Sequence, residues 1–198
     1  MKILGSLPDA VSAAWECLPG GGRICELGQR DGHQSIDFAK ICDELVLIEA
    51  RESNVRDTLH MLATGQRIAP YMRLYIADLE TFDLSVVGPC KAVSASGVIY
   101  HMSKPWELIR KIAGITDRCI GWSHLADSVW GERCGYAGQQ HIEDTESLLS
   151  GTTGDCWWLT TPEFERAFHD AGFTTFKWIE SPTPHENGGM AGWFEASK

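Results

Sequence analysis

The sequence predicts an α/β fold, a doubly wound and mostly parallel seven-stranded sheet with helices on both faces. Short apolar runs alternate with amphipathic helical segments, and parallel strands need such helical crossovers to return the chain. The last two apolar runs are separated by a short proline-containing loop instead, which is typical of an antiparallel pair at a sheet edge. With 198 residues and 43% hydrophobic content, we expect one domain over residues 1–198.

The first half of the chain repeats a strand–helix pattern. Leu7, Val11 and Trp15 at helical spacing predict a leading helix over residues 6–17, ended by Pro19 and three glycines. A strand over 23–27 breaks at Gly28 and precedes a helix over 33–42. A second strand over 45–48 leads into a polar helix that runs through residue 62, and a third strand covers 73–76.

The second half is predicted to complete the sheet around an insertion. Strands over 92–96 and 119–123 flank a helix over 105–115 that a proline begins. Periodicity fades over 126–158, which predicts an irregular substrate lid. Thr161 as cap, Pro162 and Glu163 start a helix that Gly172 stops, and strands over 174–179 and 190–195 form the antiparallel edge.

Charge and cysteine content exclude several classes of partner. The formal net charge is −10, and Lys and Arg are scattered, so we expect neither a nucleic acid nor a membrane partner. The seven cysteines contain no C-x-x-C pair, which indicates buried free thiols in a reducing compartment and no metal. The N-terminus is too polar for a signal peptide and no run approaches the ~20 apolar residues of a membrane span, so we expect a cytoplasmic protein.

Acidic residues end three successive strands, where an open α/β sheet binds its ligands. Glu26 precedes a turn flanked by Gly28 and Gly32, where backbone can approach a ligand closely. Glu49 lies 21 positions after Gly28, close to the offset at which an acid reaches a ribose diol. Asp78 ends the third strand and is placed to accept a hydrogen bond from an exocyclic amine such as that of adenine.

The charge of this turn favours one kind of nucleoside. Glu26 would repel the pyrophosphate of a nicotinamide dinucleotide, and Arg30 breaks the G-x-G-x-x-G pattern of such sites. S-adenosylmethionine carries an ammonium and a sulfonium and no phosphate, so an acid attracts it. Three roles stay open for the Arg30 side chain: exposure to solvent, pairing with Asp31, or binding a carboxylate of the cofactor or substrate.

Several segments together resemble the class I S-adenosylmethionine-dependent methyltransferase family. ICELGQRDGHQS is similar to the first cofactor motif, LVLIEAR to the ribose strand and YIADLE to the adenine loop. AVSASGVIYHM resembles the fourth strand and its loop, while TDRCIGWSHLAD and WWLTTPEFERAFHDAGF resemble the fifth strand and late helix of small-molecule members. Family members usually carry a glycine where Arg30 stands.

The resemblance and the strand ends together give a set of expected site residues. The expected cofactor contacts are Glu26, Leu27, Gly28, Gln29, Gly32, Glu49, Ala50, Asp78, Leu79, Ser96 and Gly97. The expected acceptor contacts are Tyr100, His124, Trp130, His141 and Trp158. His101, just past the fourth strand, is the candidate general base for a hydroxyl acceptor, with a loop-shaping structural role as the alternative.

The resemblance implies transfer of a methyl group from S-adenosylmethionine to a small polar acceptor, such as a hydroxyl of a sugar or natural-product metabolite. Two alternatives stay open. The first is a regulatory protein that binds S-adenosylmethionine without catalysis, and the second is an NAD-dependent oxidoreductase. The oligomeric state also stays open.

Overall fold

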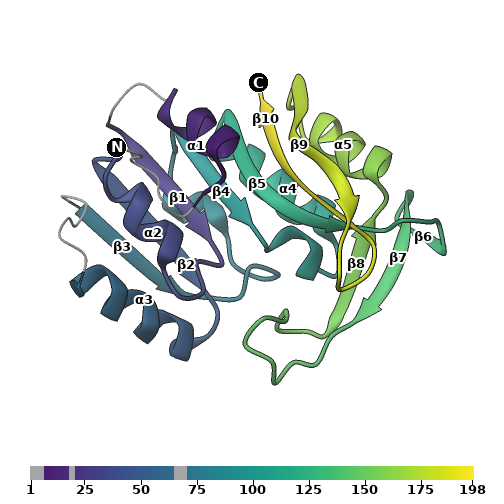
Figure 1. Cartoon of the computed structure of the whole chain (residues 1–198), viewed down its shortest axis with the longest axis horizontal. Coiled ribbons are helices and arrows are strands. Elements are labelled where there is room, and N and C mark those ends of the chain that lie inside the picture. The colour runs from purple at the N-terminus through teal and green to yellow at the C-terminus, as the bar shows by residue number, and fades with distance from the viewer. Residues whose placement is uncertain (1–6, 18–20, 65–70) are drawn as a thin grey trace.

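A computed structural model describes residues 7–17, 21–64 and 71–198, and within these ranges seven strands form one sheet in the order β3-β2-β1-β4-β5-β10-β9 (Figure 1). The strands are β1 (Arg23–Leu27), β2 (Glu44–Glu49), β3 (Tyr71–Ile76), β4 (Ala92–Ser96), β5 (Arg118–Leu125), β9 (Thr175–Pro184) and β10 (Met190–Ser197). β10 is antiparallel to β5 and β9, while the other pairings are parallel. The predicted mostly parallel sheet with an antiparallel edge is confirmed.

Helices cover both faces of this sheet, as a doubly wound fold requires. One face carries α1 (Asp9–Glu16), α2 (His33–Phe38) and α3 (Glu52–Thr64), and the other carries α4 (Pro105–Ala113) and α5 (Thr161–Asp170) (Figure 1). Leu45 and Leu47 of β2 lie in the apolar cluster with Trp15 of α1, whereas Val46 and Ile48 lie in the cluster around α4 and α5. Alternate residues of a central strand therefore serve two separate cores.

The segment 126–158 is more regular than the sequence predicts. It holds β6 (Gly131–Arg133), β7 (Tyr136–Ile142) and β8 (Asp155–Leu159), an antiparallel sheet beside the large one (Figure 1). The glycines of this segment interrupt the strand pattern in the sequence. One of them, Gly138, is required by close packing, because a Cβ there would lie 2.2 Å from the Trp158 carbonyl oxygen. The irregular part is only the 143–154 loop between β7 and β8. This loop lies at the carboxyl edge of the large sheet (Figure 1).

Several element boundaries also differ from the prediction. α2 ends at Phe38 instead of running to residue 42, and Thr161 is the first residue of α5 instead of its cap. β9 continues through Pro182 and Pro184, which the sequence placed in a loop. Proline fits there because β9 is an edge strand and need not donate to a further neighbour. Two short 3₁₀ helices complete the chain, η1 (Leu84–Val87) and η2 (Ile99–His101). The predicted ends at Ser6 and Pro19 lie outside the described residues.

The seven cysteines are all free thiols, but not all are buried. Cys17 and Cys134 are exposed, which corrects the expectation for these two, while the other five are buried. Among the described helices, none is long and apolar enough to cross a membrane.

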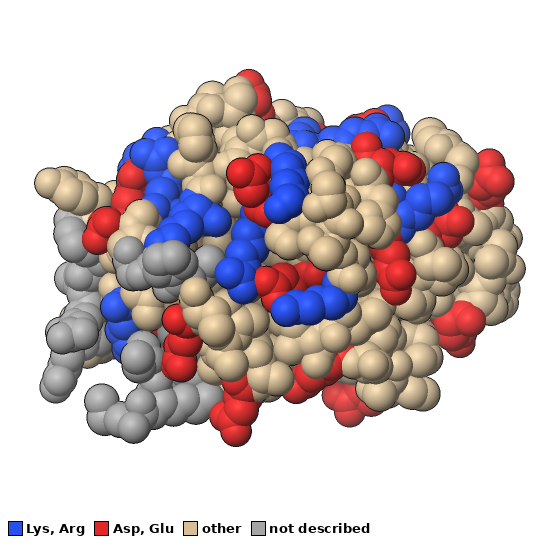
Figure 2. All heavy atoms as spheres, turned by 90° about the horizontal axis from the view of Figure 1, so that it is seen from above, with Lys and Arg blue, Asp and Glu red and all other residues tan. Residues whose placement is uncertain are grey.

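Charged side chains of both signs share the surface near the C-terminus. Figure 2 shows Lys and Arg lying beside Asp and Glu on the face seen from above. Lys177 pairs with Glu195 at 2.6 Å, and Lys198 pairs with Asp117 at 3.2 Å. These two lysines are therefore paired with carboxylates.

Candidate functional site

A cavity of about 780 Å³ opens at the carboxyl ends of β1 to β5, under the 143–154 loop. Most of the residues predicted from the sequence line it. These are Glu26, Gly28, Gln29, Glu49, Ala50, Asp78, Leu79, Ser96, Gly97, Tyr100, His101, His124, His141 and Trp158.

Three predicted contacts lie outside the cavity lining. Leu27, the last residue of β1, is buried in the apolar cluster that contains α4 and α5. Gly32 has a φ of 79°, and a Cβ there would lie 2.9 Å from Thr58 Cα, so this glycine serves the packing of α2 on α3. Trp130 is 75% exposed and donates from Nε1 to Ser128 Oγ at 2.7 Å. The structure therefore does not support these three as ligand contacts.

Glu49 is held at the cavity by main-chain donors. Its side chain is buried, with Oε2 accepting from the Arg30 amide at 3.2 Å and Oε1 from the Arg51 amide at 3.0 Å. Each carboxylate oxygen has a further lone pair, so both can still accept hydrogen bonds from a ligand. The position suits recognition of two neighbouring hydroxyls.

Arg30 contributes its backbone to the first turn more than its side chain. Its φ of 52° lies in the left-handed region, where a glycine is easier to accommodate. The carbonyl accepts from Thr58 Oγ1 at 2.9 Å, while the side chain is 60% exposed with Nε 3.9 Å from Asp31 Oδ2. Of the three open roles, the structure favours exposure and pairing with Asp31.

Unsatisfied polar groups gather behind this turn. Glu26 is buried, and burial raises the pKa of its carboxyl to about 8, although a 2.5 Å hydrogen bond from Ser35 Oγ opposes the shift. Both polar atoms of the Gln29 amide are buried without a hydrogen-bond partner among the described residues. A cationic group beside Glu26 would favour its carboxylate form, and a polar ligand would satisfy Gln29.

Asp78 is connected to the loop above the cavity. Its Oδ1 accepts from the Glu80 amide at 2.9 Å, and its Oδ2 accepts from Thr152 Oγ1 at 2.9 Å. The first bond fixes the carboxylate in its turn, while the second ties it to the 143–154 loop. The third acidic strand end therefore touches the predicted lid directly.

Aromatic rings form the opposite side of the cavity. Trp158 lies between His124, stacked at 4.9 Å between ring centroids, and His141, stacked at 4.2 Å. Tyr100 meets Trp158 edge-on at 6.0 Å and Trp122 edge-on at 5.8 Å. Such faces suit the apolar side of a ring-shaped ligand.

His124 stays neutral in this aromatic side of the cavity. Burial lowers the pKa of His124 to about 4, and the neighbouring His185 adds to the effect. Nδ1 of His124 is buried without a hydrogen-bond partner among the described residues. This side of the cavity thus offers a neutral polar group at His124.

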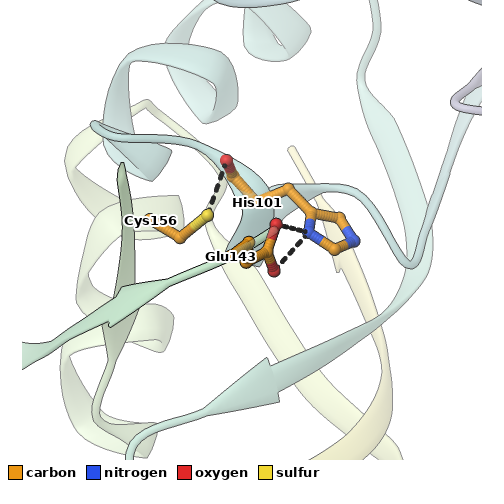
Figure 3. A group of neighbouring side chains, drawn as sticks. All are labelled: His101, Glu143 and Cys156. Carbon is orange, nitrogen blue, oxygen red and sulfur yellow. Dashed lines mark hydrogen bonds and ion pairs between the residues drawn. The ribbon is translucent and has the colours of Figure 1, made fainter. Parts of the chain in front are cut away.

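His101 is paired with Glu143, the first residue of the 143–154 loop (Figure 3). Its Nδ1 lies 2.7 and 2.8 Å from the two carboxylate oxygens of Glu143, and both side chains are largely buried. Burial would raise the pKa of Glu143, but the hydrogen bonds from His101 and the Gly151 amide outweigh it and lower that pKa. An ionised Glu143 accepts a hydrogen bond from Nδ1–H, and Nε2 points away from Glu143 in Figure 3. In the tautomer with its proton on Nδ1, Nε2 is the acceptor atom of the ring.

Cys156 adds a third donor near this pair. One donor atom each from His101, Glu143 and Cys156 lie within 4.8 Å of one another, a spacing that could hold a metal ion. However, burial raises the pKa of the Cys156 thiol, which donates to the His101 carbonyl at 3.2 Å. Hydrogen bonds within the chain therefore connect all three residues.

Sequence reasoning did not single out Glu143, His185 or Arg51 as cavity residues. Glu143 comes 42 positions after its partner His101, and no local pattern connects them. His185 follows β9 in a loop that carried no signal. Arg51 lies in the segment LVLIEAR, which resembles the ribose strand, so that segment did point to it. Trp122, one of the aromatic residues expected at the mouth of the pocket, lines the cavity.

Comparisons with known proteins give structural matches only, since no protein-family model and no curated protein matches the sequence. The N-terminal domain of EvdMO1 with SAH bound is 26% identical, with a TM-score of 0.83 over 98% of this chain and 82% of that chain. The same domain in the presence of SAH and D-fucose is 25% identical, with a TM-score of 0.81 over 98% and 84%. Magnesium protoporphyrin IX methyltransferase from Synechocystis PCC 6803 with bound SAM shares the fold, at 16% identity and a TM-score of 0.60 over 94% and 74%.

Proposed function

We propose that this chain, which has the fold of the S-adenosylmethionine-dependent methyltransferases among its structural neighbours, transfers a methyl group from S-adenosylmethionine to a hydroxyl of a small polar acceptor. The acceptor class we infer is a sugar or a sugar-bearing natural-product metabolite. One observation carries the proposal: a single cavity joins three acidic strand ends to a histidine–glutamate pair.

The residues of the first turn fit S-adenosylmethionine. Gly28 has a φ of 62° and a Cβ there would lie 3.2 Å from Val98 Cγ2, so only glycine leaves the turn open. The unpartnered Gln29 amide and the buried Glu26 would meet the polar amino-acid end of the molecule, with Glu49 on the ribose and Asp78 on the adenine. When bound, S-adenosylmethionine supplies a methyl group on a sulfonium that departs as a neutral thioether.

In the proposed mechanism, His101 is the general base. The Nε2 atom accepts the proton of the acceptor hydroxyl while the acceptor oxygen bonds to the methyl carbon and the carbon–sulfur bond breaks. The ring becomes an imidazolium, whose positive charge faces the ionised Glu143. Because the leaving group is good, placing the hydroxyl in line with the methyl group contributes much of the remaining rate enhancement.

The aromatic side of the cavity supports a sugar-like acceptor. Trp122, Trp158 and Tyr100 offer apolar faces, and the neutral His124 offers a hydrogen-bonding group beside them. The EvdMO1 domain was solved in the presence of D-fucose, which favours the same acceptor class for this chain. The 143–154 loop lies over the cavity, and we infer that it acts as the substrate lid.

A turnover assay tests the proposal. The protein is incubated with S-adenosylmethionine and a panel of hexoses, 6-deoxyhexoses and their glycosides, and formation of S-adenosylhomocysteine is followed with the mass of the methylated product. We expect methyl transfer to at least one hydroxyl-bearing member. Binding of S-adenosylhomocysteine by calorimetry with no turnover on any panel member would favour the regulatory alternative. A thermal shift with NAD alone would overturn the cofactor assignment.

A further inference from the structure

The 143–154 loop buries little apolar surface of its own. It contains no helix or strand, and Leu148 and Leu149 are 54% and 57% exposed. Hydrophobic burial therefore contributes little to its placement, and its position depends on polar contacts with the rest of the chain.

Arg51 supplies three of these contacts. Its Nη2 donates to the carbonyl oxygens of Thr145 at 2.8 Å, Ser150 at 3.2 Å and Gly151 at 3.3 Å. One guanidinium thus ties together both ends of the loop segment 145–151. The main-chain amide of Arg51 donates to Glu49, so the same residue contacts the acid assigned to the ribose.

Gly151 connects this clasp to His101. Its amide donates to Glu143 Oε2 at 2.6 Å, and a Cβ at this position would lie 2.8 Å from the His101 carbonyl oxygen. The loop backbone therefore packs directly on His101 while it holds the Glu143 carboxylate. A shift of Gly151 would disturb both partners at once.

We propose that Glu143 is a positioning residue for His101, and that Arg51 keeps Glu143 in place by clasping the 143–154 loop. The clasp makes the placement of the base depend on a residue of the cofactor side of the cavity. The inference rests on the proposed function, because positioning matters for catalysis only if His101 takes the acceptor proton. Its structural part, however, can be measured without any acceptor.

The test compares Glu143→Ala, Glu143→Gln and Arg51→Met with Arg56→Met as the matched control. The Arg56 side chain is 77% exposed on α3, with an ion pair to Glu52. NMR of the ¹⁵N-histidine-labelled protein reports whether the His101 Nδ1 proton is held in a hydrogen bond. We expect this proton signal in the native protein, in Glu143→Gln and in Arg56→Met, because the glutamine oxygen can still accept. We expect its loss in Glu143→Ala and in Arg51→Met.

Steady-state kinetics with an acceptor identified by the turnover assay give the second readout. Loss of a residue that orients a functional histidine lowers kcat by about 10- to 100-fold, which we expect for Glu143→Ala, with a smaller effect on the acceptor KM. Glu143→Gln should have a higher kcat than Glu143→Ala. The kcat of Arg51→Met should lie between those of Glu143→Ala and the control Arg56→Met.

Three outcomes would overturn the inference. A native Nδ1 signal in Glu143→Ala would remove Glu143 from the positioning role, and a native signal with native kcat in Arg51→Met would remove the clasp. A chelator that shifts the His101 signals of the native protein would show that a metal, and not the glutamate, holds the ring. Failure of methyl transfer with these NMR results intact would count against the proposed function instead.

Discussion

The two sides of the cavity are built in different ways. On the side that we assign to the cofactor, main-chain amides hold two of the acids, since Glu49 accepts from two amides and Asp78 from one. On the acceptor side, side chains hold one another, as in the stack of His124, Trp158 and His141. Amides of the turns that follow β1, β2 and β3 hold the first side, with one further contact from Thr152 to Asp78. The second side is held by stacked rings from segments remote in sequence.

The two sides also differ in charge, and this difference has a functional meaning. The cofactor side gathers carboxyl groups, which favour a cationic nucleoside. The acceptor side carries aromatic rings and a histidine, His124, that its low pKa keeps neutral at physiological pH. We therefore expect substitutions on one side to change cofactor affinity and substitutions on the other to change turnover or acceptor affinity.

The largest difference between the effect on turnover and the effect on cofactor affinity is expected for His101→Ala. Removal of a general base lowers turnover by about 10²- to 10⁴-fold, while affinity for S-adenosylhomocysteine stays native. Steady-state kinetics and calorimetry on the same preparation measure the two quantities, with the exposed His60→Ala as control. A turnover equal to that of the native protein would leave His101 with its structural role only.

Glu49→Ala should give the converse result. Loss of charge-assisted hydrogen bonds to the ribose costs about 1 to 3 kcal/mol, a weakening of binding by roughly 5- to 150-fold. Calorimetric titration with S-adenosylhomocysteine measures it, and Glu52→Ala on the exposed start of α3 is the matched control. Unchanged affinity would contradict the ribose assignment.

Glu26→Gln should remove a pH dependence from the cofactor side. The free protein has a carboxyl with a pKa of about 8, and a cationic ligand favours the carboxylate, so native affinity should rise as pH increases toward 8. The glutamine amide cannot ionise. Calorimetric titration with S-adenosylhomocysteine between pH 6 and 8 should therefore show a lower affinity for the variant, and one that changes less with pH. An equal pH dependence in both proteins would place the titrating group elsewhere.

The same substitution should stabilise the fold at alkaline pH. The carboxyl of Glu26 has its pKa raised from 4.5 to about 8, so the native state loses stability as pH rises between these values. Glu26→Gln avoids the buried charge, and its Tm should exceed the native Tm at pH 8 by more than at pH 5. A Tm difference that does not grow with pH would argue against a buried, raised-pKa carboxyl.

The smallest effect is expected for the aromatic faces. Trp122→Leu should raise the acceptor KM by about 5-fold, since an aromatic face contributes about 1 kcal/mol beyond area burial. Trp130→Ala, which changes an exposed ring outside the cavity, should leave both KM values native. Equal effects of the two variants would show that the cavity assignment of the rings is wrong.

The parts predictable from sequence are those that local pattern determines. The succession of strands and helices along the chain and the acids at the strand ends follow from alternating apolar runs. The fold that the resemblance to class I methyltransferases implies is confirmed by the sheet and the structural neighbours. The position of Arg30 in a left-handed turn explains why a glycine is usual there.

The parts that sequence could not give depend on contacts between distant segments. Gly131 of β6 and Gly138 of β7 resemble loop glycines in the sequence. Only the structure shows that Gly138 packs closely on Trp158. Glu143 follows β7 and lies 42 positions after its partner His101, and Arg51 reaches carbonyl groups about 100 positions away. Such pairs leave no periodic signal in a single sequence.

A crystal structure of the protein with S-adenosylhomocysteine tests the central claim most directly, namely that the acids bind the nucleoside and His101 serves the acceptor. We predict that the ribose hydroxyls lie on Glu49, that the adenine amine lies near Asp78, and that the sulfur faces the aromatic side with His101 Nε2 turned toward the same space. A ribose bound away from Glu49, or a sulfur directed away from His101, would contradict it.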